Sequence, residues 1–251
     1  PAVQPLTWTG NVSSVWADKG NWLRGVVPIA TNDVWIPGAS IGTNLAKLAD
    51  DRAVRSLTTE VGGQLDLAAH TLTVSQDLNS QSGLITGGTL LLTGADASAT
   101  GIVQSDIVVG DLGCSLKTRI HIPQFLIIQG SLLARCPVFV GDGLLSVTGP
   151  ATFTDQGTLG LLVSGSAAQF LGDVTFGGPN NSLLVDGVIA IGGNFKQVGS
   201  ASNFAPALNV ETHFIGSDPQ NRQTILFDDT RLSRFSQLFV SNTGAGVQIL
   251  P

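Results

Sequence analysis

Glycine recurs at a nearly constant interval along most of the chain, and this recurrence limits the possible fold more than any other feature. The intervals are 22, 20, 19, 23, 21 and 23 residues, and the glycines are Gly88, Gly110, Gly130, Gly149, Gly172, Gly193 and Gly216. The residue two positions before each glycine is apolar in six of seven cases, and so is the residue two positions after it. An apolar side chain at every second position is typical of a β-strand. A repeating unit of about 20 residues indicates coils stacked into a solenoid.

The composition agrees with this interpretation. The 251 residues include 31 glycines, 43% hydrophobic residues and only 12% charged residues. Disordered segments contain far fewer apolar residues than this. We therefore predict an all-β fold: a parallel, right-handed β-solenoid (β-helix) of about nine coils, which at about 4.8 Å per coil forms a rod of about 40–50 Å.

The tryptophans are confined to the start of the chain, at Trp8, Trp16, Trp22 and Trp35. The first coil of a solenoid has an unpaired strand edge and an apolar end, which large aromatic side chains can cover. We predict that residues 1–37 form an N-terminal cap and that residues 38–251 form the solenoid, which continues or is covered by a partner beyond residue 251. The four tryptophans are also candidates for carbohydrate contacts, because exposed aromatic faces bind sugar rings.

The chain has two cysteines, Cys114 and Cys136, separated by about one coil. Neighbouring coils lie about 4.8 Å apart, which suits the Cα separation of a disulfide. Their positions relative to the preceding glycines differ by two residues, however, so the register between them is imperfect. Either a disulfide or two buried free thiols fit this pattern. Two cysteines alone do not make a metal site.

The charge distribution excludes several classes of partner. The net charge is −6, and the 12 lysines and arginines are spread thinly, which argues against nucleic acid binding. No apolar run is long enough for a membrane-spanning helix. No glycine-rich loop precedes a helix, so we predict no nucleotide and no other cofactor. Calcium is the most plausible ion, but turns such as residues 217–221 offer at most one carboxylate each, too few for a specific site.

Three sequence patterns are candidates for a catalytic site. Glycoside hydrolysis needs two carboxylates, and the best local pairs are Asp50–Asp51 and Asp228–Asp229. Adjacent residues of a strand face opposite sides, and aspartates in turns commonly bond to their own backbone. Residues 38–42 match the Gly-x-Ser-x-Gly pattern around Ser40, but the helices that such a nucleophile elbow requires are missing. We therefore predict that the chain is not an enzyme.

Motifs at both ends of the chain resemble a known group of proteins. The N-terminal motifs are Trp8-Thr9-Gly10, Trp16-Ala17-Asp18, Asn21-Trp22, Val27-Pro28 and Asp33-Val34-Trp35-Ile36. They resemble the entry segment of secreted bacterial β-solenoid surface proteins, including autotransporter-passenger-like and adhesin-like repeat proteins. The C-terminal motifs Gly193-Asn194-Phe195, Phe214-Ile215-Gly216, Gln223-Thr224-Ile225 and Leu238-Phe239-Val240 are similar to repeats of the same group. The resemblance implies an exported, surface-associated β-helix and names no substrate.

The predicted function is that of a non-enzymatic extracellular or cell-surface module, which acts in adhesion or assembly through a rigid solenoid. Its expected partners are other copies of itself, other surface proteins or polysaccharide. The alternative is a carbohydrate-active β-helix enzyme or a polysaccharide-binding domain. An enzyme should have a groove where two carboxylates, or a carboxylate and an arginine, converge on one face. A structural module should have flat faces and an end surface that pairs with another copy.

Overall fold

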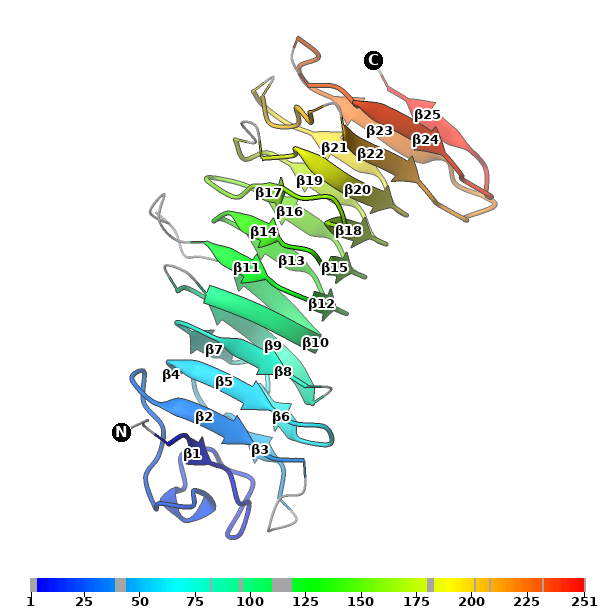
Figure 1. Ribbon diagram of the computed structural model, residues 1–251. Helices are drawn as coiled ribbons and strands as arrows, with labels where there is room; N and C mark the ends of the chain where they lie inside the picture. The colour runs from blue at the N-terminus through cyan, green and yellow to red at the C-terminus, as the bar shows by residue number, and fades with distance from the viewer. Residues whose placement is uncertain are drawn as a thin grey trace.

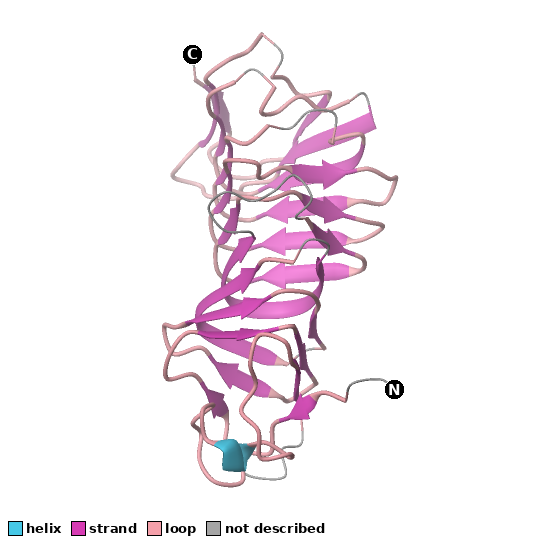
Figure 2. Cartoon of the chain, turned by 90° about the vertical axis from the view of Figure 1, so that its left-hand side faces the viewer, coloured by secondary structure: helices cyan, strands magenta, loops and turns pink. Residues whose placement is uncertain are grey.

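The computed structural model shows a parallel β-solenoid of about nine turns, stacked from the N-terminus to the C-terminus (Figure 1). The structure describes residues 4–38, 44–81, 83–94, 97–109, 119–179, 183–200, 202–207, 209–231 and 233–250. Pairings between its strands are parallel throughout the described part. The one helix among the described residues is a single 3₁₀ turn, η1 (Lys19–Asn21), near the N-terminal end of the rod (Figure 2). The predicted all-β class and parallel stacking are confirmed, and the right hand stays a prediction.

The strands form three faces. Sheet 1 contains β1 (Leu6–Thr7), β2 (Asp33–Ile36), β5 (Ser56–Thr59), β8 (Leu78–Ser80), the middle of β10 (Ala97–Val109), β12 (Phe125–Ile128), β15 (Leu144–Val147), β18 (Ala167–Phe170), β20 (Asp186–Ile191), β22 (Asn209–Phe214) and β24 (Gln237–Val240). Sheet 2 contains β3 (Ala46–Lys47), β4 (Arg52–Val54), β6 (Gln64–Asp66), β7 (Thr71–Val74), β9 (Leu84–Leu92), the end of β10, β13 (Leu132–Ala134), β16 (Ala151–Phe153), β19 (Val174–Phe176), β21 (Phe195–Gln197), β23 (Gln223–Phe227) and β25 (Val247–Ile249). The shorter sheet 3 contains the start of β10, β11 (Ile120–Ile122), β14 (Val138–Val140) and β17 (Leu159–Leu161).

The core is a continuous column of inward side chains. In strands such as β2 and β5, buried and partly exposed residues alternate, as the period of two requires. Each inward residue lies on its counterpart in the next turn, for example Val34 on Leu57, Leu57 on Leu78, and Leu78 on Ala99. All four are buried. Burying each larger aliphatic side chain contributes about 1.5–3 kcal/mol, so the column stabilises the rod along its whole length.

Four of the recurring glycines stack directly on one another at the corner between sheets 1 and 2. A Cβ atom on Gly149 would lie 2.7 Å from the Gly130 oxygen, and one on Gly172 would lie 2.6 Å from the Gly149 oxygen. A Cβ atom on Gly193 would lie 2.4 Å from the Gly172 carbonyl carbon. The recurrence therefore has a steric cause, because successive backbones approach too closely there for any side chain.

One position of the predicted ladder differs. The register of β10 against β12 and β13 puts Ser105 opposite Gly130. The Ser105 hydroxyl donates a hydrogen bond to the Gly87 oxygen at 2.7 Å, so it also bridges to the preceding turn. Gly110, which the spacing assigned to this ladder, lies outside the described residues. Strand β10 runs through the corner with a register shift and needs no glycine there.

Three tryptophans interlock at the N-terminal end. The ring centroids of Trp8 and Trp22 are 5.1 Å apart and those of Trp16 and Trp22 are 4.7 Å apart, both edge to face. The indole nitrogen of Trp22 donates to the Trp16 oxygen at 2.8 Å. All three side chains are at most 2% exposed, as expected of a capping layer. Trp35 belongs instead to β2, which already stacks on β5, so a solenoid strand lies inside the segment that the sequence assigned to the cap.

The cysteines can be placed only in part. Cys136 follows β13 and is fully buried in the core. Cys136 is disulfide-bonded. Cys114 lies outside the described residues, so its part in that bond stays a prediction. Comparing the masses of the unreduced and the reduced protein under denaturing conditions distinguishes a bridge from two thiols.

Candidate functional site

A groove of about 900 Å³ lies on the outer face of sheet 1, over the N-terminal half of the rod. Its lining residues come from β2, β5, β8, β10 and β12, which are stacked in this order (Figure 1), and from the turns that flank them. Four intervals of about 4.8 Å give the groove a length of roughly 19 Å along the rod. It is long enough to hold several units of an extended ligand.

A ladder of neutral polar side chains forms the floor of the groove. Because Leu57, Leu78 and Ala99 point into the core, the residue that follows each of them points outward. These are Thr58, Asn79 and Thr100, which are register partners on three consecutive turns. In the next turn the equivalent position belongs to Phe125, because Gly101 pairs with Leu126.

Five polar side chains of the groove are not engaged by the protein itself, whereas those of Asp33, Ser56 and Ser80 are hydrogen-bonded. Within the described part of the chain, no hydrogen bond involves the side chains of Thr58, Asn79, Gln81, Thr100 or Gln124. Elsewhere on the outer face of sheet 1, two pairs of polar side chains bond to each other. Ser146 donates to Gln169 at 3.4 Å, and His213 lies 2.9 Å from Glu211. The groove is thus a part of this face whose hydrogen-bonding capacity remains open to a ligand.

Charged groups line one side of the groove. Asp33 accepts two hydrogen bonds from the guanidinium of Arg55, one from Nε at 2.7 Å and one from Nη2. These bonds hold the pKa of the Asp33 carboxyl below its ordinary value, since they favour the charged form. Asp77 lies one turn beyond Ser56, and its charge also acts on Arg55. Two carboxylates and one guanidinium leave the groove with a net negative charge.

The lowered pKa of Asp33 predicts a specific acid sensitivity. The stability that this ion pair adds is present above the ordinary pKa of 3.8 and is lost as the pH falls through the lower folded-state pKa. We expect the Asp33→Asn variant to melt below the wild type at pH 6, and the difference to shrink towards pH 2. Thermal melts across this range measure it. Asp155→Asn, at an exposed turn, is the control, and its melting temperature should equal that of the wild type at every pH. A difference in melting temperature between Asp33→Asn and the wild type that does not change with pH would contradict the lowered pKa of Asp33.

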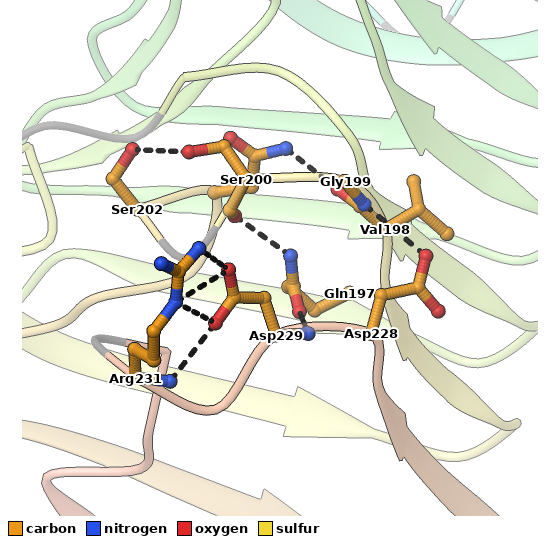
Figure 3. Close-up of polar contacts among 9 residues, drawn as sticks. Gln197, Val198, Gly199, Ser200, Ser202, Asp228, Asp229 and Arg231 are labelled. Carbon is orange, nitrogen blue, oxygen red and sulfur yellow. Dashed lines mark hydrogen bonds and ion pairs between the residues drawn. The ribbon is translucent and has the colours of Figure 1, made fainter.

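The pair Asp228–Asp229 has structural partners instead of a groove (Figure 3). The Asp229 carboxylate accepts four hydrogen bonds from Arg231, one from the backbone N–H, two from Nε and one from Nη2 at 2.6 Å. Its backbone N–H donates to the buried Gln197 side chain at 3.1 Å. Asp228 accepts from the Gly199 N–H at 3.2 Å. The Asp228 carboxylate and the Asp229 N–H therefore hold this loop onto the preceding turn, while Arg231 engages the Asp229 carboxylate within the loop.

The other acidic candidates are engaged in a similar way. Asp50 accepts from Arg52, and Asp51 accepts from the Thr71 N–H at 2.8 Å. The Asp218 carboxylate accepts from the Asn221 side chain and from the backbone of Gln220 and Asn221, which together lower its pKa. Among the described residues, no three His, Cys, Asp or Glu side chains gather as a metal site. Ser40 lies outside the described residues.

The candidate tryptophans separate into two groups. Trp8, Trp16 and Trp22 are buried in the cap and have no exposed ring face for a sugar. Trp35 is half-buried and is the register partner of Thr58, so it belongs to the outward ladder that continues into the groove. The groove residues themselves are not among the site residues predicted from the sequence. The signal that could have found them is the interval of 21 residues between Thr58, Asn79 and Thr100 at outward positions.

The described residues contain no helix with the length and apolar character needed to cross a bilayer. Comparison with known proteins finds no matching family model, no matching curated protein and no matching solved structure.

Proposed function

We propose that this chain is a non-enzymatic interaction module of the extracellular space or the cell surface, which binds an extended partner along the outer face of sheet 1. The observation that supports this most strongly is the groove, where unpaired polar side chains from successive turns face solvent. The parallel ladder fixes these side chains at regular intervals, so little conformational entropy is lost when a partner binds. The likeness of the terminal motifs to adhesin-like surface solenoids supports the same class of function.

The charges of the groove favour binding over catalysis. A glycosidase needs one carboxyl group with a raised pKa, which donates a proton to the leaving oxygen. Asp33 has the opposite property, because Arg55 stabilises its charged form. The carboxylate–arginine pair that an enzyme would use is present, but its bidentate geometry matches a fixed structural contact.

Incubation with insoluble polysaccharides and with cell-envelope preparations tests this proposal. We expect the protein to sediment with at least one of these materials and to release no reducing sugar and no unsaturated product. Bovine serum albumin serves as the control for non-specific adsorption. Steady release of soluble sugar would favour the enzyme alternative, and failure to bind any surface would remove the adhesion role.

Self-association through the last described turn, which contains β24 and β25, is a second candidate function. Three apolar side chains in the last turn are exposed: Leu238 by 41%, Val240 by 58% and Ile249 by 68%. Their register partners in the preceding turn, Thr212, Phe214 and Ile225 respectively, are buried. An exposed rung of this kind can pair with another copy. Sedimentation velocity tests it: we expect concentration-dependent association that Val240→Lys weakens, and a monomer at every concentration would exclude it.

A further inference from the structure

We propose that the groove on sheet 1 binds a neutral oligosaccharide segment, laid across successive turns of the solenoid. This inference rests on the proposed interaction function and gives its ligand a chemical class. It is carried by three properties of the groove: its free hydrogen-bonding groups, its charge and its apolar rim.

The hydrogen-bonding groups match a ligand rich in hydroxyls. Asn79, Gln81 and Gln124 each offer both a carbonyl oxygen and an NH₂ group, and Thr58 and Thr100 each offer a hydroxyl. Each of these five side chains can therefore both donate and accept hydrogen bonds, and so can every sugar hydroxyl. None of the five side chains has to break a bond within the described part of the protein to engage a ligand. A neutral polyhydroxylated chain can therefore satisfy them turn after turn.

The charge of the groove selects against polyanions. Asp33 and Asp77 face the groove, and among the described residues Arg55 is the cation coupled to both, on a chain whose net charge is −6. Nucleic acids and acidic polysaccharides would be repelled, because their binding requires a basic surface. The carboxylates can still accept hydrogen bonds from neutral hydroxyls.

The rim adds apolar surfaces of the kind that pack against the C–H face of a sugar ring. Phe125 is partly exposed at the far end of the polar ladder, with Pro123 exposed beside it in the lining. Trp35, also partly exposed, is not itself a lining residue, but it follows the lining residues Asp33 and Val34 and is the register partner of Thr58. Aromatic side chains at both ends of a polar ladder provide flat packing surfaces with little entropy loss.

A peptide in extended conformation fits the groove less well. A peptide adds to a sheet through an unpaired strand edge. The strands beneath the groove are central members of sheet 1, and their backbone groups bond to neighbouring turns, as in the bond from Leu57 N–H to the Asp77 oxygen at 2.9 Å. Recognition must therefore come from side chains, as the saccharide proposal requires.

An array of neutral oligosaccharides, with hexose, pentose and N-acetylhexosamine backbones, identifies a probe for calorimetry. We expect binding to at least one neutral backbone, with the dissociation constant raised about fivefold in Asn79→Ala through loss of its hydrogen bonds. Phe125→Ala should raise it about tenfold through loss of the stacking face. The matched control is Gln169→Ala, on the same face of sheet 1 but bonded to Ser146 outside the groove, and it should bind like the wild type. Each variant is first required to keep the wild-type circular dichroism spectrum.

Three results would overturn the inference. They are binding to no neutral oligosaccharide, preferential binding to polygalacturonate or heparin, and neutral binding that Asn79→Ala and Phe125→Ala leave unchanged. If the protein still sediments with cell envelopes while any of these results is obtained, the interaction function stands and the saccharide assignment alone fails. If oligosaccharides bind and envelopes do not, the surface role fails instead.

Discussion

Replacement of Gly172 by alanine is expected to lower the free energy of unfolding by about 3 kcal/mol, the upper end of the cost of overpacking. The new Cβ atom would lie 2.6 Å from the Gly149 oxygen and 2.7 Å from its carbonyl carbon. Neither atom can move aside freely, because neighbouring hydrogen bonds hold the turns together, such as that from Leu171 N–H to the Val147 oxygen at 2.8 Å. Guanidinium unfolding followed by circular dichroism measures the loss.

Gly141→Ala is the matched control for this substitution. Its nearest contact would be the Ile122 oxygen at 3.4 Å, an ordinary van der Waals distance. We expect a change below about 1 kcal/mol, as for surface substitutions generally. Equal losses in the two variants would mean that close approach of the turns is not what requires the glycines.

Phe176→Ala is expected to cost about 4 kcal/mol, the usual loss for removing a buried phenylalanine. The Phe176 ring lies parallel to Phe153 with the centroids 5.0 Å apart, and it also contacts Phe195 at 5.8 Å and Phe204 at 4.9 Å. Its removal leaves a cavity among these phenylalanine rings. The turns are held too closely by their hydrogen bonds to move and fill it. The same denaturation experiment measures it.

Phe139→Ala provides the comparison for a phenylalanine on the outside. Phe139 lies on the outer face of sheet 3 and stacks on His121 with the centroids 5.5 Å apart. Its removal should cost about 1 kcal/mol, the value of an aromatic pair with little burial. A larger loss in Phe139→Ala than in Phe176→Ala would contradict the inward and outward assignment of sheets 2 and 3.

The sequence predicted the fold because both of its signals are local. The period of two sets which side chains enter the core, and the glycine recurrence marks a corner where backbones touch. The pattern could not identify Ser105 at that corner, since a register shift in β10 lets a longer side chain fit. The tryptophan cluster was predicted correctly as a layer near the N-terminus, because three large apolar side chains must be buried somewhere.

The groove was harder to predict because it depends on contacts between turns. Thr58, Asn79 and Thr100 are separated by whole coils in the sequence, and their adjacency follows only from the register of β5, β8 and β10. Polar outward residues occur on most solenoid faces, so residue type alone gives no signal. Which of them remain without intramolecular partners is visible only once side chains are placed.

Methyl–methyl nuclear Overhauser contacts in the otherwise deuterated, unmodified protein test the stacked register most directly. Leu132, Ala151 and Val174 occupy equivalent inward positions on three consecutive turns of sheet 2. The structure predicts cross-peaks between Leu132 and Ala151 and between Ala151 and Val174, and a much weaker or absent one between Leu132 and Val174, two turns or about 9.6 Å apart. Cross-peaks that pair the strands in opposite directions, as in a sandwich, would contradict the solenoid and everything inferred from it.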